Sequence, residues 1–507
     1  MKKPVSFRFN VLVTSISQFY ISLIGIVIMP LYVNYMGIEA YGLIGFFGML
    51  QAWFQLLDVG LSPTMARETA RYNGGDVKSD HLWHLLRVLT YFFLGTAGIG
   101  AVVMILSSNY LSQHWLKVQT LSVHEIKLSM ILISLIITLR WVACLYRSVV
   151  TGFEQFGWLS SFNFATTTAR FILVLPVLIW ISAAPSTFFA YQLIVAVLEL
   201  TVLSLYAYRL MPALPEKPNW KLETLKPILG FSLGIAFTSG INTFILQTDK
   251  LILSKLLSLS DYAYFTLGVI CASGVLLATS PISAPIIPRL TNLNAQKDHT
   301  QFIRLYRNTT QFVGVIALPL AWILAFFAHP ILLAWTNNAL VAQNAAITLT
   351  LYALGNGLFA LIAFPFYLQF AKGDIKLHIL GSGLLITVLI PAFIWSTLHF
   401  GVMGAGATWL CVTLAYLLFW TPLVHNRFFK DLHWKWLFSD ILPLVVLSGL
   451  STWVIAHFIH LPANRFWVVG FLGLITMTVI GITAMGSSFF RTTLLSLKTQ
   501  LINRLSA

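Results

Sequence analysis

The chain of 507 residues is 58% hydrophobic and only 9% charged, and its formal net charge is +15 at pH 7. This balance excludes a soluble globular domain and is typical of a protein embedded in a membrane. The basic residues lie in short stretches between long apolar runs and not along one stripe, so they indicate membrane topology and argue against nucleic-acid binding.

Apolar runs close to the ~20 residues that cross a bilayer as a helix recur about fourteen times along the chain. They lie at approximately 11–34, 41–62, 86–107, 127–148, 157–181, 187–209, 228–251, 260–283, 308–328, 345–369, 376–398, 402–424, 438–460 and 465–487. The first run follows Met1-Lys2-Lys3 as in a signal peptide, but it is too long and lacks a clear cleavage site of small residues. We therefore expect a retained first span and an all-α polytopic membrane protein.

Lysine and arginine are concentrated in every second connection between these runs. One set of connections holds most of them, including Lys2, Arg67, Lys217, Arg289, Lys372, Arg427 and Arg491. The other set holds few, chiefly Lys117, Lys127, Lys255 and Arg465. Because basic connections stay on the cytoplasmic side, this asymmetry predicts that both termini are cytoplasmic.

An internal repeat organises the predicted helices. The stretch 31–43, which leads into a span ending at Arg67, is echoed by the stretch 251–264, which leads into a span ending at Arg289. Six spans separate the copies, so both copies have the same orientation in the membrane. This predicts two six-helix lobes related by a pseudo-twofold axis along the membrane normal, with the substrate path between them.

The last two spans have no counterpart in this repeat and are predicted to be an added helix pair. The expected divisions are an N-terminal six-helix lobe at 1–210, a cytoplasmic linker at 211–227, a C-terminal six-helix lobe at 228–426, an interfacial segment at 427–437, the extra helix pair at 438–488 and a cytoplasmic tail at 489–507.

A predicted hairpin at 126–181 carries arginine at positions where lipid normally forbids it. Arg140 lies in the middle of its first apolar run and Arg170 in the middle of its second, while Arg147 follows Arg140 by two helical turns and shares its face. A charged side chain at the bilayer centre costs at least ~2.5–3.5 kcal/mol, so it normally faces a cavity or a partner. We expect this hairpin to line a cationic, water-filled lumen that binds an anionic substrate.

Two alternatives stay open for these arginines. Glu199, near the middle of the sixth run, can neutralise one of them within the first lobe, which still leaves the site positive. Arg147 lies nearer the inner surface and can be an ordinary anchor of the helix end.

Three further charged positions are candidates. Lys250 and Asp249, near the outer end of the seventh run, can form the outer rim of the lumen or a simple interfacial pair. Asp58, near the inner end of the second run, can anchor the helix end, pair with Arg67 or bind a coupling ion. Glu199, Asp249 and Asp58 are the acidic candidates for coupling to protons or sodium.

Three stretches carry a resemblance to a known family. The segment 31–42, which ends in Glu39-Ala40-Tyr41-Gly42, is similar to the stretch that joins the first two helices of Wzx-type O-antigen and polysaccharide flippases. The segment 57–61 followed by Arg67 resembles the end of their second helix, and the segment 248–255 resembles the start of their second lobe. The chain is thus identified as resembling the polysaccharide transporters of the multidrug/oligosaccharidyl-lipid/polysaccharide exporter superfamily.

This resemblance implies a flippase of polysaccharide biosynthesis. Its expected substrate is an undecaprenyl-pyrophosphate-linked oligosaccharide, such as the O-antigen unit of lipopolysaccharide, carried by alternating access from the cytoplasmic to the periplasmic leaflet of the bacterial inner membrane. The expected partners are this substrate, membrane lipids and polysaccharide polymerase or assembly proteins, with a monomer as the transport unit.

Two other functional classes are alternatives to the flippase. A multidrug or cation antiporter of the same superfamily requires an acidic cavity and usually stops at twelve helices. A membrane enzyme of polysaccharide assembly, such as a ligase or polymerase, tends to carry a large outer loop, whereas the longest outer connection here, 107–125, is short.

The sequence shows no motif for catalysis or for a cofactor. There is no Walker-type phosphate loop, and the histidines form no convincing metal cluster. The three cysteines, Cys144, Cys271 and Cys411, lie within apolar runs, which disfavours disulfides and metal binding. We expect a protein that is not an enzyme and that needs no cofactor or metal.

Overall fold

A computed structural model describes residues 7–213, 226–283, 285–462 and 464–492. Within these ranges every named element is a helix, and β pairing is limited to an isolated bridge between Lys117 and Ser258. The all-α fold predicted from the apolar runs is therefore confirmed.

The chain is a multi-pass membrane protein. Among the described residues, 12 helices are long and apolar enough to cross a membrane. One of them, Lys376–Phe428, contains two predicted spans, and its backbone leaves helical geometry between them at Gly401 (φ 57°, ψ −138°), a conformation that favours glycine. The predicted span 228–251 falls in α10 (Lys226–Leu256), which is not one of the 12, so the count of fourteen spans stays a prediction.

The helices divide into two compact units, Met1–Ala263 and Tyr264–Ala507. The boundaries predicted from the repeat, with a second lobe starting at residue 228, concern internal symmetry and stay a prediction. Most of the predicted linker at 211–227 and of the tail at 489–507 lies outside the described residues.

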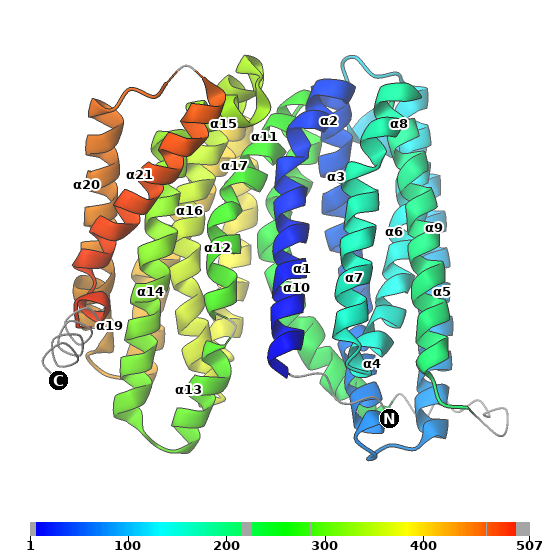
Figure 1. The fold of residues 1–507 in the computed structure, drawn as a ribbon, viewed down its shortest axis with the longest axis horizontal. Helices are drawn as coiled ribbons and strands as arrows, with labels where there is room; N and C mark the ends of the chain where they lie inside the picture. Colours follow the sequence, from blue (N-terminus) through cyan, green and yellow to red (C-terminus); the bar gives the residue numbers. More distant parts are fainter. Residues whose placement is uncertain (1–6, 214–225, 284, 463, 493–507) are drawn as a thin grey trace, which may run out of the picture. The chain divides into compact units, whose positions relative to one another are not determined.

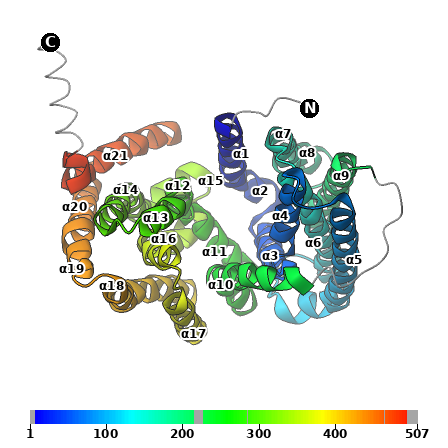
Figure 2. The same ribbon diagram turned by 90° about the horizontal axis from the view of Figure 1, so that it is seen from below.

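The first unit is built around one long helix, α6 (Val123–Gly152). Figures 1 and 2 show α6 surrounded by neighbours that also contact it in the coordinates. These neighbours are α3 (Ile38–Phe54), α4 (Leu61–Asn73), α5 (Ser79–Tyr110), α7 (Phe156–Thr167) and α9 (Pro185–Leu210). The remaining helices of the unit are α1 (Phe7–Val27), α2 (Met29–Met36), α8 (Val174–Trp180), α10 and the first turn of α11 (Leu259–Ala272).

A local signal at the start of α6 and a tightly packed apolar face explain its position. The hydroxyl of Ser122 accepts a hydrogen bond from the backbone N–H of Glu125 and so caps the start of the helix. On the buried face, Trp141 stacks on Phe93 of α5 with ring centroids 4.3 Å apart. Because α6 is buried along most of its length, the direction of each of its polar side chains is fixed.

The second unit packs its helices around α14 (His299–Phe326) and α16 (Ala339–Lys372). These two helices approach closely where a Cβ at Gly357 would lie only 2.8 Å from the Cβ of Ala321. The other helices of the unit are α12 (Gly274–Ser283), α13 (Ile286–Ala295), α15 (Ala328–Thr336), α17 (Lys376–Ala415), α18 (Thr421–Phe428), α19 (Leu432–Lys435), α20 (Leu442–Phe458) and α21 (Arg465–Gly486).

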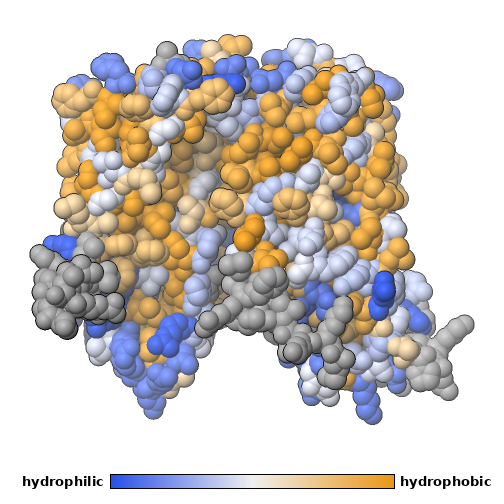
Figure 3. Space-filling model, viewed as in Figure 1, coloured by the Kyte–Doolittle hydropathy of each residue, from blue (hydrophilic) through white to orange (hydrophobic). Residues whose placement is uncertain are grey.

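The surface has the polarity that a bilayer requires. Large apolar side chains are exposed along the helices, including Leu106 at 75%, Leu205 at 66% and Leu474 at 67%. Figure 3 shows hydrophobic residues over the middle of the helices and hydrophilic residues gathered at the helix ends. An apolar exterior of this kind is stable only in contact with lipid tails.

A buried polar network holds the last two helices, α20 and α21, against α14. Arg307 donates from Nε and Nη2 to the two carboxylate oxygens of Asp440, at 2.6 and 2.8 Å. Gln311 donates to Asp440 at 2.8 Å and accepts from the hydroxyl of Ser487, which follows α21, at 2.6 Å. Asp440 is only 1% exposed. This charge-assisted network therefore fixes the start of α20 and the end of α21 to α14.

We predict that Asp440→Ala lowers the stability of the protein far more than Asp374→Ala. The first change leaves Arg307 without its buried carboxylate and is expected to cost about 3 kcal/mol. The second removes a partly exposed pair with Arg427, in which nitrogen and oxygen are 3.8 Å apart, and is expected to cost less than about 1 kcal/mol. Thermal unfolding of the purified variants in detergent measures the difference, and equal melting temperatures would contradict it.

Candidate functional site

Three helical segments of the first unit each present two polar side chains, spaced seven residues apart. α6 presents Arg140 and Arg147, and α9 presents Gln192 and Glu199. Asn163 lies on α7, and Arg170 lies in the π-helical segment η3 (Thr168–Ile172) that continues it. A separation of seven residues is two helical turns, so both members of each pair lie on one face.

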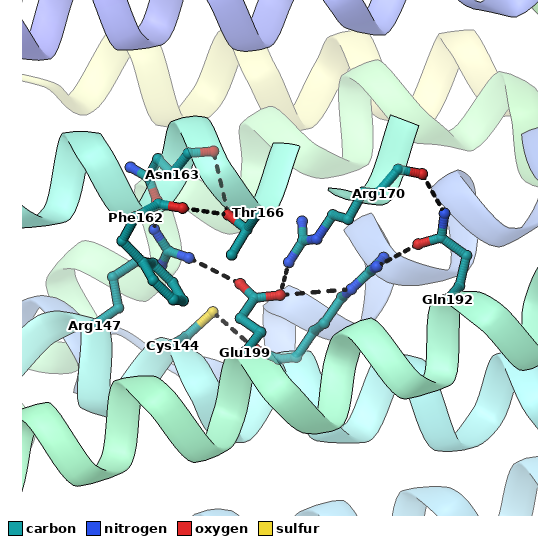
Figure 4. Close-up of polar contacts among 9 residues, drawn as sticks. Cys144, Arg147, Phe162, Asn163, Thr166, Arg170, Gln192 and Glu199 are labelled. Carbon is teal, nitrogen blue, oxygen red and sulfur yellow. Dashed lines mark hydrogen bonds and ion pairs between the residues drawn. The ribbon is translucent and has the colours of Figure 1, made fainter. Parts of the chain in front are cut away.

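The six side chains form two layers. The first layer contains Arg140, Arg170 and Gln192, and the second contains Arg147, Asn163 and Glu199. Figure 4 labels all of them except Arg140. Seven residues of helix rise by ~10 Å, which is the expected separation of the backbones of the two layers.

Glu199 joins the layers because its carboxylate contacts all three arginines. Its Oε1 accepts a hydrogen bond from Nη2 of Arg147 at 3.0 Å. Its Oε2 accepts from Nη2 of Arg170 and lies 3.9 Å from Nε of Arg140. The one acidic side chain of the cluster therefore serves three cations at once.

The neutral amide side chains of Gln192 and Asn163 also bond to the arginines. Nη2 of Arg140 donates to Oε1 of Gln192 at 2.7 Å, and Nε2 of Gln192 donates to the backbone carbonyl of Arg170 at 2.6 Å. Nη1 of Arg147 donates to Oδ1 of Asn163. The guanidinium of Arg140 also lies over the ring of Phe47, 5.6 Å from its centroid, where the cation is attracted to the ring.

The cluster has more positive charge and more donors than its own residues neutralise. Three guanidinium groups and one carboxylate leave a formal charge of +2. The buried Nε atoms of Arg140 and Arg170 have no hydrogen-bond acceptor among the described residues. A buried N–H without an acceptor is costly, and guanidinium forks match phosphate oxygens, so the arrangement is suited to an anion such as a phosphate or diphosphate.

Burial in the cluster is graded. The side chains of Glu199 and Arg140 are 3% and 7% exposed, whereas those of Arg170 and Arg147 are 23% and 31% exposed. Glu199 and Arg140 therefore form the base of the cluster, and Arg170 and Arg147 are its more exposed arginines.

The structure brings together four of the seven residues singled out from the sequence: Arg140, Arg147, Arg170 and Glu199. Glu199 contacts all three arginines and does not neutralise one alone, and Arg147 is one of its partners. Whether Arg147 binds substrate or anchors the helix end stays a prediction. Asn163 had only a weak sequence signal, which is its position two turns before Arg170 on the same helical face.

The other three residues make their contacts outside this cluster. Nζ of Lys250 donates to the carbonyl of Leu246 at 3.1 Å and to Oε1 of Gln247 at 3.0 Å. Asp249 is 5% exposed and accepts from the backbone N–H of Lys250 at 2.7 Å. These contacts do not test whether the two residues form the rim of a lumen, and that role stays a prediction.

Asp58 anchors the start of α4. Its carboxylate accepts from the backbone N–H of Ser62 at 3.0 Å and from the hydroxyl of Ser62 at 2.6 Å. A carboxylate at this place satisfies a free N–H of the first turn and interacts favourably with the helix dipole. The contacts favour the anchoring alternative, while a role in ion coupling stays a prediction.

No group of three or more His, Cys, Asp and Glu side chains within the described residues is arranged to hold a metal ion.

Comparison with known sequences gives two matches. A family described as "Polysaccharide biosynthesis protein" matches residues 7–294, which include the whole cluster. The chain is also 21% identical over 376 residues to a "Putative O-antigen transporter" of Shigella flexneri, an alignment that covers 74% of this chain and 87% of that protein.

Comparison with solved structures shows the fold. The lipid II flippase MurJ in an inward closed conformation superposes with a TM-score of 0.72 at 14% identity, covering 96% of this chain and 100% of that one. An inward-facing multidrug resistance transporter of the MATE family superposes with a TM-score of 0.63 at 11% identity, covering 81% of this chain and 96% of that one. The helical arrangement is thus shared with transporters whose sequences have diverged widely.

We predict that Glu199→Gln destabilises the protein and that Arg170→Gln partly reverses the loss. Removing the carboxylate leaves three uncompensated cations and is expected to cost about 3 kcal/mol. The double variant removes one of these cations, so its melting temperature should exceed that of Glu199→Gln alone, a non-additive result. The matched control is Glu154→Gln, at an exposed turn position; strictly additive melting temperatures would contradict the predicted coupling.

Proposed function

The chain belongs to the polysaccharide biosynthesis protein family, and on this premise we propose that it is a flippase for a lipid-linked oligosaccharide. The proposed substrate is an undecaprenyl-pyrophosphate-linked unit, such as an O-antigen repeat. It is moved by alternating access from the cytoplasmic to the periplasmic leaflet of the bacterial inner membrane. The family match supports the resemblance noted in the sequence, including its identification as a Wzx-type transporter.

The observation that carries this proposal is the +2 cluster on membrane-spanning helices. Arg140, Arg147 and Arg170 surround one carboxylate within helices that are otherwise apolar. A diphosphate offers several anionic oxygens, so it can take the places that Glu199 occupies on the two more exposed arginines and can also reach the buried Nε donors. The carboxylate then acts as a counter-ion that keeps the empty site stable.

The electrical gradient supports the direction of transport. An anion that leaves a negative-inside cell gains ~2.3 kcal/mol per charge per 100 mV, so a diphosphate headgroup is driven outward without nucleotide hydrolysis. Coupling to an ion through Glu199, Asp249 or Asp58 is compatible with this scheme. In the proposed orientation both termini are cytoplasmic, the transport unit is a monomer, and a polysaccharide polymerase is the expected partner.

The alternatives have less support. A cation or drug antiporter requires an acidic binding site, whereas the cluster described here has three cations for one anion. The likeness to the MATE transporter concerns the fold and carries no substrate with it. A ligase or polymerase has less support because the sequence relative is described as an O-antigen transporter.

We predict that Arg140→Gln combined with Arg170→Gln abolishes transport. Each change keeps a polar side chain but removes a cation that the substrate requires, and the loss in complementation is expected to be at least tenfold. The measurement is surface polysaccharide in bacteria that lack their own flippase, with the amount of protein in the membrane determined in parallel.

The matched control is Arg465→Gln, because Arg465 is exposed at the start of α21 and contacts Phe466. This variant should restore surface polysaccharide as the parent protein does. Normal surface polysaccharide from the double arginine variant, at an unchanged protein level, would refute the proposed site. Resistance to cationic drugs without surface polysaccharide would favour the antiporter.

A further inference from the structure

The helix that carries Arg170 is interrupted at this residue. Between α7 and α8 the segment η3 is π-helical, and the backbone N–H of Leu173 bonds to the carbonyl of Thr168, five residues earlier, at 3.0 Å. Pro176 in α8 has no N–H, so it cannot provide the usual helical donor for the carbonyl of Ile172. Short π-helical segments within α-helices occur frequently at functional sites, and η3 is one of four in the described part of the chain.

Side chains from two other helices hold three successive carbonyls of this segment. Tyr191 donates to the carbonyl of Ala169 at 3.0 Å, and Gln192 donates to that of Arg170 at 2.6 Å. Tyr32 of α2 donates to the carbonyl of Phe171 at 2.7 Å. We call Tyr32, Tyr191 and Gln192 the carbonyl cradle.

The cradle differs from the ordinary hydrogen bonds of polar residues in membrane helices. Most hydroxyl groups here bond to a carbonyl one turn earlier on their own helix, as Thr166 does to Phe162 and Thr201 does to Val197. Tyr32, in contrast, bonds across 139 positions of sequence and is fully buried. Such bonds fix the conformation of η3 from outside the helix.

The conformation of η3 determines where Arg170 points. A π-helical turn contains one residue more than an α-helical turn, so conversion to an α-helix would rotate the helix on one side of the segment by ~100° relative to the other. Arg170 would then lose its alignment with Glu199 on α9. Gln192 also accepts from Arg140 at 2.7 Å, so one side chain positions both arginines of the first layer.

We propose that Tyr32, Tyr191 and Gln192 are positioning residues of the transport site. They hold η3 in its π-helical form so that Arg170 and Arg140 together bind the diphosphate end of the substrate. This inference rests on the proposed function, since it assumes that the cluster binds a diphosphate.

The test compares the binding of two lipids to the purified full-length protein in nanodiscs. The probes are undecaprenyl diphosphate and undecaprenyl phosphate. Two variants are compared with the parent protein. The first is Gln192→Leu, and the second is the double variant Tyr32→Phe with Tyr191→Phe. We expect each variant to bind the diphosphate at least tenfold more weakly, a change of ~1.4 kcal/mol. The preference for diphosphate over monophosphate should fall, because a misplaced Arg170 no longer reaches the second phosphate.

The matched control is Tyr72→Phe, which removes a hydroxyl from the same unit at a ring that packs against Phe153. It should bind both lipids as the parent protein does. Phenylalanine keeps the ring and its packing, so the tyrosine variants decide the question if Gln192→Leu does not fold. Their melting temperatures should stay within a few degrees of the parent protein.

The outcomes separate this inference from the proposed function. If Arg140→Gln with Arg170→Gln loses diphosphate binding but the cradle variants keep it, the cradle has no positioning role and the proposed function stands. If the arginine variant binds the diphosphate normally, the proposed function itself is wrong. An equal loss for both lipids together with a lower melting temperature would show that the cradle only supports the fold, which also overturns the inference.

Discussion

The contact between Glu199 and three arginines is the constraint on which the first unit depends. Charged groups inside a membrane are expensive, so they are stable only when other charges and dipoles are aimed at them. Here α6, α9 and the α7–η3 helix each contribute two polar side chains, and their seven-residue spacing aligns them in two layers. The packing of α6 at the centre of the unit holds this alignment, because its apolar face leaves no freedom to rotate.

In the second unit, an arginine is neutralised by a single buried carboxylate. Arg307 and Asp440 form a balanced pair, with Gln311 and Ser487 completing the hydrogen bonds. A balanced, satisfied network is suited to joining helices, and this one attaches the C-terminal helix pair. The cluster around Glu199 keeps an excess of two positive charges and two buried N–H groups without acceptors. This imbalance is the physical difference between the two networks, and it is the reason for proposing that the cluster around Glu199 binds an anion.

The π-helical segment η3 interrupts the helix at Arg170, a residue of the cluster. A regular α-helix needs no side chains to satisfy its carbonyls, whereas η3 receives three donors from α2 and α9. The shared fold of the MurJ and MATE structures, at identities of 14% and 11%, shows that the helical frame tolerates wide sequence change.

The sequence by itself determined the all-α membrane fold, most of its spans, and the presence of Arg140 and Arg170 in the middle of apolar runs. Hydropathy and the cost of buried charge act locally along the chain, so they can be judged from the sequence. Its family resemblance is confirmed by the match over residues 7–294. Only the tertiary structure decided that Glu199 contacts three arginines, that Asn163 and Gln192 complete the layers, and that Asp58 bonds to Ser62 in the first turn of α4. These contacts depend on how each helix is rotated about its axis and on a π-helical turn. Neither can be predicted from hydropathy, since both are set by side chains that lie far apart in sequence and meet only on packing.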